Sequence, residues 1–192
     1  MALQPYASNS AAAMHGALVP IASTTISGSS TSAFSFTSIP QTYQDLRLVI
    51  TTRSAQPGNN LAVFYLWANG DESSATGLYS ATNLQGDGTS ATSSRQTSQN
   101  QAIIGFSVNN GATSGIFASN TIDILNYTNT TTFKTSLSRS AGDLNGSGAT
   151  LLVAALRRST SAITSLYFRA DGGYAQIAGA TATLYGIRTV GQ

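Results

Sequence analysis

The chain has 192 residues, of which only 8% are charged and 41% are hydrophobic, and Ser and Thr together supply 52. Soluble domains carry about 25% charged residues and disordered chains are poor in hydrophobic ones, so this composition describes a folded chain with unusually little charge. The absence of cysteine excludes disulfides, thiolate metal sites and cysteine nucleophiles.

Residues 1–31 are small, polar and weakly patterned. We expect them to form an extended N-terminal arm that becomes ordered on a neighbouring subunit, and a frayed terminus is the alternative. Within this segment, Leu18 to Ile26 could form one strand. Pro20 interrupts it, which suits an edge strand or a strand start. We place a single β-sandwich domain at residues 32–192.

From residue 32 onward, hydrophobic and polar residues alternate with period two, which is typical of half-buried β-strands. Leu46, Leu48 and Ile50 share one face of such a strand. Residues 61–68, LAVFYLWA, are nearly all apolar and predict a central strand that is buried on both faces. Further strands are predicted at 33–37, 77–84, 101–108, 116–127, 132–140, 150–158, 163–169 and 174–187.

Turn residues separate these strands. Asn69-Gly70 and Asn145-Gly146 are pairs that tolerate positive φ and therefore favour sharp turns. Residues 85–100 contain no hydrophobic residue larger than alanine, and we interpret them as an exposed loop with a role in interaction. Many short strands without a convincing helix predict an all-β chain folded as an antiparallel β-sandwich, and we expect the jelly-roll type.

The charge distribution does not favour nucleic acid or a membrane as a partner. The net charge is +2, and only Arg157 and Arg158 are adjacent, whereas phosphate binding uses a cluster of cations on one face. No apolar run approaches the roughly 18 residues of a membrane span. Because no Lys or Arg precedes Arg47, we expect no signal peptide.

We expect no catalytic, cofactor-binding or metal-binding residue, and hence no enzyme. His15 lies in the predicted arm, where nothing holds it as a catalytic triad would require. Most of the seven acidic residues lie in predicted turns beside Gly, where Asp is favoured for backbone reasons, rather than as the carboxylate pair of a glycosidase. Asp71 and Glu72 could ligate Ca²⁺ together with loop carbonyls, but a plain turn is the simpler interpretation.

The aromatic residues are spread through nearly every predicted strand. Strand aromatics are usually core residues, whereas a sugar-binding face would expose Tyr and Trp in loops. We therefore expect a core role for the following residues: Phe64, Tyr65, Trp67, Tyr79, Phe106, Phe117, Tyr127, Phe133, Tyr167, Phe168, Tyr174 and Tyr185.

Four segments are distinctive in combination. They are FTSIPQTYQDLRLVI at 36–50, LYSATNLQGDG at 78–88, IDILNY at 122–127 and ATLYGI at 182–187. Their order resembles a group of small structural proteins in the virions of tailed bacteriophages, including phages of cyanobacteria and other aquatic bacteria. The resemblance covers roughly residues 32–188 and leaves the arm unmatched.

The resemblance implies a β-sandwich subunit displayed on a virion, commonly as a homotrimer, that is assembled in the host cytoplasm without an export signal. We expect a capsid decoration, or cement, protein that binds the major capsid protein on the outer head surface as a homo-oligomer and stabilises the shell. The alternative is a tail-fibre or tail-tip module, attached to a tail protein, that binds a host-surface receptor or glycan through loops such as 85–100 and 109–115.

Overall fold

The computed structural model describes residues 18–28, 33–73 and 77–188. Within these ranges the chain forms twelve strands and two single-turn 3-10 helices, η1 (Asp71–Ser73) and η2 (Asp171–Gly173). The strands are β1 (Leu18–Thr25), β2 (Phe34–Phe36), β3 (Asp45–Thr52), β4 (Leu61–Ala68), β5 (Tyr79–Gly86), β6 (Ala91–Gln99), β7 (Ala102–Val108), β8 (Ala118–Ile124), β9 (Lys134–Asp143), β10 (Gly148–Arg157), β11 (Leu166–Ala170) and β12 (Thr181–Ile187).

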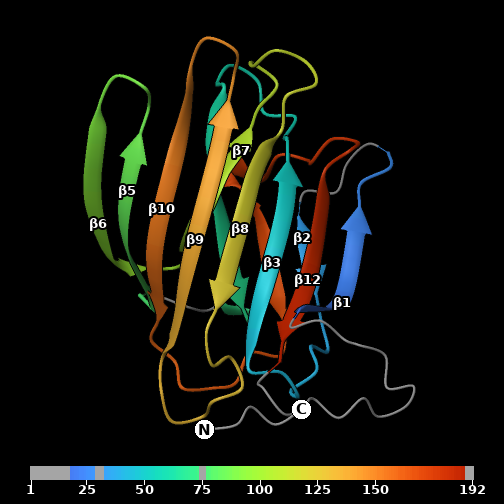
Figure 1. Cartoon of the computed structure of the whole chain (residues 1–192), viewed down its shortest axis with the longest axis vertical. Helices are drawn as coiled ribbons and strands as arrows, with labels where there is room; N and C mark the ends of the chain where they lie inside the picture. The colour runs from blue at the N-terminus through green and yellow to red at the C-terminus, as the bar shows by residue number, and fades with distance from the viewer. Residues whose placement is uncertain (1–17, 29–32, 74–76, 189–192) are drawn as a thin grey trace, which may run out of the picture.

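The strands build two antiparallel sheets that pack face to face. The large sheet has the order β1-β12-β3-β8-β9-β10-β5-β6, and the small sheet has the order β2-β11-β4-β7. Figure 1 shows the large sheet towards the viewer, with the small sheet behind its middle and right-hand strands. The predicted all-β antiparallel sandwich is therefore confirmed. The jelly-roll type stays a prediction, because the standard pattern has eight strands.

The first described strand lies at one edge of the large sheet. β1 pairs with β12, and its register shifts between Pro20 and Ala22, so the predicted edge strand with an irregularity at the proline is confirmed. Of the predicted arm at 1–31, residues 18–28 are described and contain β1. The remainder of the arm, including His15, lies outside the described residues.

The predicted loop at 85–100 is wrong, because most of it is a strand. β5 continues to Gly86, and residues 91–99 form β6, which pairs with β5 as a hairpin. The turn between them includes Gly88 at φ 90°, a conformation that favours glycine. The sequence gives no period-two signal here, because β6 is exposed on both of its faces and needs no apolar side.

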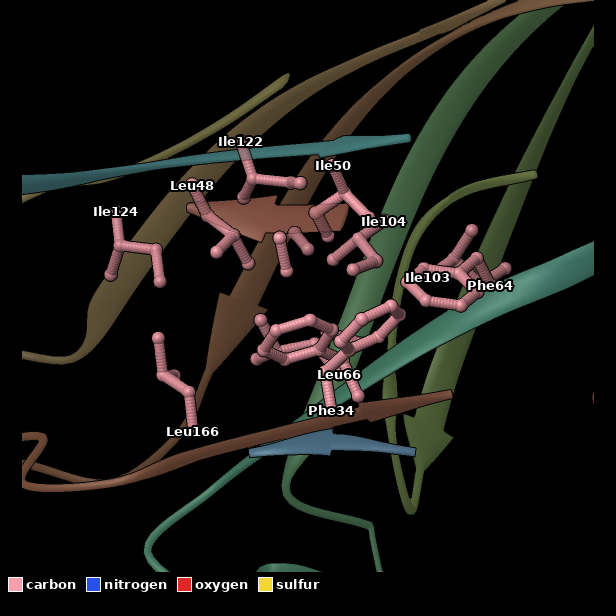
Figure 2. Close-up of a cluster of buried hydrophobic side chains, with 14 of the residues drawn as sticks. Phe34, Leu48, Ile50, Phe64, Leu66, Ile103, Ile104, Ile122, Ile124 and Leu166 are labelled. Atoms are coloured by element: carbon pink, nitrogen blue, oxygen red, sulfur yellow. The ribbon is translucent and has the colours of Figure 1, made fainter. Parts of the chain in front are cut away.

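The core lies between the two sheets and is built by their inward-facing side chains. Figure 2 shows Leu48, Ile50 and Ile122 of the large sheet pointing towards side chains of the small sheet. Phe168 is fully buried, and its ring centroid lies 5.4 Å from that of Phe34 and 6.2 Å from that of Phe64. Burial of these apolar side chains is the main source of stability for the sandwich.

The prediction that residues 61–68 form a central strand buried on both faces is correct only in part. Phe64, Leu66 and Ala68 belong to the core, whereas Tyr65 and Trp67 point to the outer face of the small sheet. Trp67 is buried there and Tyr65 is half-buried, so the strand is covered on both faces only towards its C-terminal end. The outer side of the small sheet thus carries aromatic side chains.

Candidate functional site

Strand β6 forms the edge of the large sheet that lies opposite β1, and among the described residues it pairs only with β5. Seven of its nine residues are exposed and the other two are half-buried, so within the described part of the chain no layer covers either face. Its single charged side chain is Arg95, whose Nη1 donates a hydrogen bond to Thr82 Oγ1 at 3.0 Å. No strand of the described ranges therefore pairs with the outer backbone edge of β6, which is bordered mainly by Ser, Thr and Gln.

An edge of this kind normally carries protection against pairing with other chains. Natural sheets protect edges with Lys, Pro, bulges or short strands. Both edge strands have a register shift, in β1 at Pro20 and in β6 near Ser98, but β6 has neither Lys nor Pro and runs for nine residues, longer than the usual five or six. The two edges of the sheet are therefore unequal, and β6 is the one suited to accept an added strand.

The outer face of the large sheet carries apolar side chains beside this edge. Leu84, Leu137 and Leu152 are 53%, 44% and 43% exposed, and we call them the outer leucine patch. Leu152 lies directly opposite Leu84 across β10 and β5, and a shallow hollow of about 380 Å³ beside them reaches Ala91 at the start of β6. The patch and the free edge thus form one continuous surface.

Little charge remains on the outside of the molecule. Arg53, Asp71, Lys134 and Arg157 are buried, which leaves twelve of the sixteen charged side chains for the surface. Buried Arg53 donates from Nη1 to the backbone carbonyls of residues 113 and 116 and from Nη2 to that of residue 112. These bonds anchor the 109–115 segment, which the sequence suggested as a binding loop, to the sandwich.

The outer face of the small sheet carries an aromatic cluster made of Tyr65, Trp67 and Tyr167. The Trp67 ring lies 6.1 Å from Tyr65 and 5.7 Å from Tyr167, measured between ring centroids. Burial raises the pKa of both tyrosines, and nearby Asp171 and Glu72 reinforce the shift for Tyr65 and Tyr167 respectively. Both hydroxyls are therefore neutral donors at physiological pH.

Arg169 extends across this cluster. Its guanidinium carbon lies 5.3 Å from the centre of the Trp67 ring, a cation–π distance, and its Nη2 lies 3.4 Å from Glu72 Oε1. Gly173 makes room for it, because a Cβ at that position would lie 2.4 Å from Arg169 Nη1. Aromatic rings, a guanidinium and a carboxylate thus meet on one face.

The acidic residues do not form a free carboxylate pair. Asp71 and Glu72 follow the Asn69-Gly70 turn in the single-turn helix η1, where Asp71 points into the protein and Glu72 points out towards Arg169. The partners of the seven acids are as follows: Asp45 with the Asn126 N–H, Asp71 with Arg157 and Tyr79, Glu72 with Arg169, Asp87 with Thr89 and Ser90, Asp123 with Arg47, Asp143 with the Asn145 N–H, and Asp171 with the Gly172 N–H.

Sequence reasoning missed the free edge and the aromatic cluster. The expected core role holds for five of the aromatic residues and is wrong for six of them. The core residues are Phe64, Tyr79, Phe106, Tyr127 and Phe168, and Phe117 packs partly buried against them. Phe133 and Tyr174 are exposed, and the residues on outer faces are Tyr65, Trp67, Tyr167 and Tyr185. A usable signal existed in two segments, LAVFYLWA and LYFRA, because each places aromatic or charged residues at alternate positions. Those positions share one face once β4 and β11 pair.

The described ranges contain neither a group of potential metal ligands nor a helix that could span a membrane. No group of three or more His, Cys, Asp or Glu residues there could hold a metal ion. No helix in the same part of the chain is long and apolar enough to cross a membrane. Comparisons of the chain with protein-family models, with curated proteins and with solved structures gave no match.

Proposed function

We propose that this chain is a structural subunit of a bacteriophage virion, a decoration or cement protein that binds the outer head surface as a homo-oligomer and stabilises the shell. The observation that carries the assembly role is the free β6 edge beside the outer leucine patch. The bacteriophage setting comes from the sequence resemblance over residues 32–188.

The edge supports the proposal because backbone N–H and C=O groups along a strand bind a second strand with little regard for side chains. A nine-residue edge offers enough length for a full added strand. A closed trimer would use this contact head to tail, so that β6 of one copy meets a different surface of the next.

The outer leucine patch supports the same conclusion. Apolar burial stabilises contacts by about 25 cal/mol per Å², before the entropy of association is subtracted. Arg47 and Asp123, which lie on the same face, neutralise each other through a 2.6 Å ion pair. The exposed cation Arg139 lies directly opposite Leu152 on this face and has no ion pair among the described residues, so a partner that covers the patch would have to accommodate its charge.

We further infer that the sandwich is of the jelly-roll type. The chain alternates between the sheets, with β2, β4, β7 and β11 in the small sheet and the intervening strands in the large one. Such alternation is typical of a jelly roll, in which Greek keys span two sheets. The β8-β9-β10 meander then widens the large sheet between β3 and β5.

The test compares two edge variants of the purified protein. Lysine is a natural edge protector, so Thr92→Lys combined with Ser94→Lys on β6 should block strand addition. The matched control, Ser23→Lys with Thr25→Lys, places the same charges on β1. Light scattering after size exclusion gives the oligomeric state, and co-sedimentation with purified heads of the phage that encodes the chain gives attachment.

We expect the wild-type protein and the β1 variant to form oligomers and to co-sediment with heads, and the β6 variant to lose one or both properties. A wild-type protein that stays monomeric at high concentration and ignores both heads and tails would contradict the proposal. Hundreds of copies per particle would place the protein on the head, and a few dozen at most would place it on the tail.

The second candidate is a tail-fibre or tail-tip module that binds a host-surface glycan, and the aromatic cluster favours it. Sugar rings stack on aromatic side chains, while Arg169 and Glu72 could bind their hydroxyls. Tyr65 and Tyr167 are the accessible members, because Trp67 is buried beneath them and Arg169.

Saccharide binding can be followed through the fluorescence of Trp67, the only tryptophan in the chain. If the cluster binds glycan, Tyr167→Ala should abolish a saccharide-dependent change in emission while the melting temperature stays within a few degrees of wild type. Trp67→Ala should instead lower the free energy of unfolding by about 2 kcal/mol, because its ring is buried. No response to host-surface polysaccharide would remove this candidate.

A further inference from the structure

Three polar side chains form a row on the inner face of the large sheet. Arg157 lies directly opposite Lys134 on β9 and directly opposite Tyr79 on β5. Directly opposed residues of antiparallel strands have Cβ atoms about 5 Å apart. Exposure is 7% for Arg157, 2% for Lys134 and 1% for Tyr79, so two cations are buried side by side.

One carboxylate faces these two cations. Asp71 accepts hydrogen bonds from Arg157 Nε at 2.7 Å and Nη2 at 3.2 Å, and from the Tyr79 hydroxyl at 2.6 Å. Within the described ranges, Lys134 Nζ donates only to neutral groups, the backbone carbonyls of Thr132 at 2.8 Å and Thr160 at 3.0 Å. Asp71 is therefore committed to Arg157 and Tyr79, and the group retains one excess positive charge.

Buried charge is costly unless it is paired. Burial and the nearby charge of Arg157 both lower the pKa of Lys134, because both make its charged form less favourable. Arg157 Nη1 is buried and has no hydrogen-bond partner among the described residues. The group therefore has both a surplus charge and a spare donor.

A small cavity between the sheets adjoins the same side chains. Its volume is about 20 Å³, and its lining includes Lys134, Arg157 and Tyr79. The rest of the lining is largely apolar and includes Leu66, Ala68, Ala102, Ile124 and Ile163, so the two cations are the charged groups that an ion there would meet. A space of roughly 10–15 Å³ already holds one water molecule. This cavity therefore suits one particle of the size of a water molecule or a halide ion.

We propose that this cavity is a binding site for one small monovalent anion, of which chloride is the representative, held by Arg157 and Lys134. The ion supplies the charge that Asp71 does not balance and accepts the spare Arg157 donor. It acts as a structural link between β9, β10 and β5 of the large sheet and β4 of the small sheet, independently of what the β6 edge binds.

The direct test uses bromide, which replaces chloride and scatters anomalously. Crystals of the wild-type protein grown in bromide should show one anomalous peak per chain in the cavity, in contact with Arg157 and Lys134. Bromide confined to the protein surface, with water or no density in the cavity, would overturn the proposal.

A solution test uses chloride at constant ionic strength, with gluconate as the replacing anion. Raising chloride from about 1 mM to about 100 mM should raise the Tm of the wild type by several degrees. Lys134→Met should lose this dependence, whereas Arg139→Met, which removes an exposed cation from the same strand, should keep it. An equal chloride response in both variants, or none in the wild type, would contradict the proposal. If Lys134→Met does not fold, the bromide crystals decide alone.

Discussion

The core strands of the sandwich and the edge strand β6 are built on opposite principles. In the sandwich, inward-facing residues such as Leu48, Ile50 and Phe168 are fully buried. Strand β6 has no buried residue, and within the described part of the chain its support comes from pairing with β5. Figure 1 shows the β5–β6 hairpin at the far left of the large sheet, away from β1.

The association that we propose for β6 would therefore use a different part of the chain from the one that stabilises the fold. Core strands hold their place through apolar burial, which is the dominant favourable term in folding. An exposed polar edge adds little to that term and yet leaves a line of hydrogen-bonding groups available to a partner. Substitutions should therefore divide into those that change unfolding and those that change assembly.

Phe168→Ala should produce the largest loss of stability. The ring is fully buried and contacts Phe34, Phe36 and Phe64, so its removal leaves a cavity in the middle of the core. We expect the free energy of unfolding in urea to fall by about 3–5 kcal/mol. Phe133→Ala is the matched control, because Phe133 is exposed, and should cost less than about 0.5 kcal/mol.

Asp71→Asn should come next, with a loss of about 3 kcal/mol. The substitution leaves Arg157 buried without a counter-charge, and a broken buried pair is far more costly than an exposed one. Asp123→Asn breaks the more exposed Arg47–Asp123 pair and should cost about 0–1 kcal/mol. Equal losses in urea unfolding would show that burial does not distinguish the two pairs.

The β6 double variant, Thr92→Lys with Ser94→Lys, tests whether β6 contributes to association and not to stability. Both positions are exposed, so we expect a change of less than about 0.5 kcal/mol in the free energy of unfolding. Association measured by light scattering should nevertheless weaken. A drop in stability of more than about 1 kcal/mol would mean that the hairpin is part of the cooperative core.

Much of the sandwich was predictable from local pattern. Leu46, Leu48 and Ile50 alternate with more exposed residues and are all fully buried, as the period-two signal indicated. Asn69 and Gly70 both adopt positive φ, as the sharp turn requires. These features depend on neighbours within a few residues, so sequence alone contains them.

The remaining features depend on contacts between distant segments. Arg157 and Asp71 are 86 positions apart, and their ion pair exists only because β10 ends beside η1. Trp67 and Tyr167 meet because β4 and β11 pair, which no local pattern specifies. β6 was missed for a different reason: a strand exposed on both faces has no apolar period to detect.

The hairpin turn offers the smallest and most local test. Asp87 accepts hydrogen bonds from the backbone N–H and hydroxyl groups of Thr89 and Ser90, and these bonds hold its pKa far below the usual value. Because the folded pKa is depressed, this contribution is fully present above the unfolded pKa of about 3.9 and is lost only as the pH falls through the folded value. Carboxyl chemical shifts should therefore show Asp87 still ionised at pH 4, where a free aspartate is half protonated. Titration of Asp87 near pH 4 would mean that the turn, and with it the start of β6, is not held in solution.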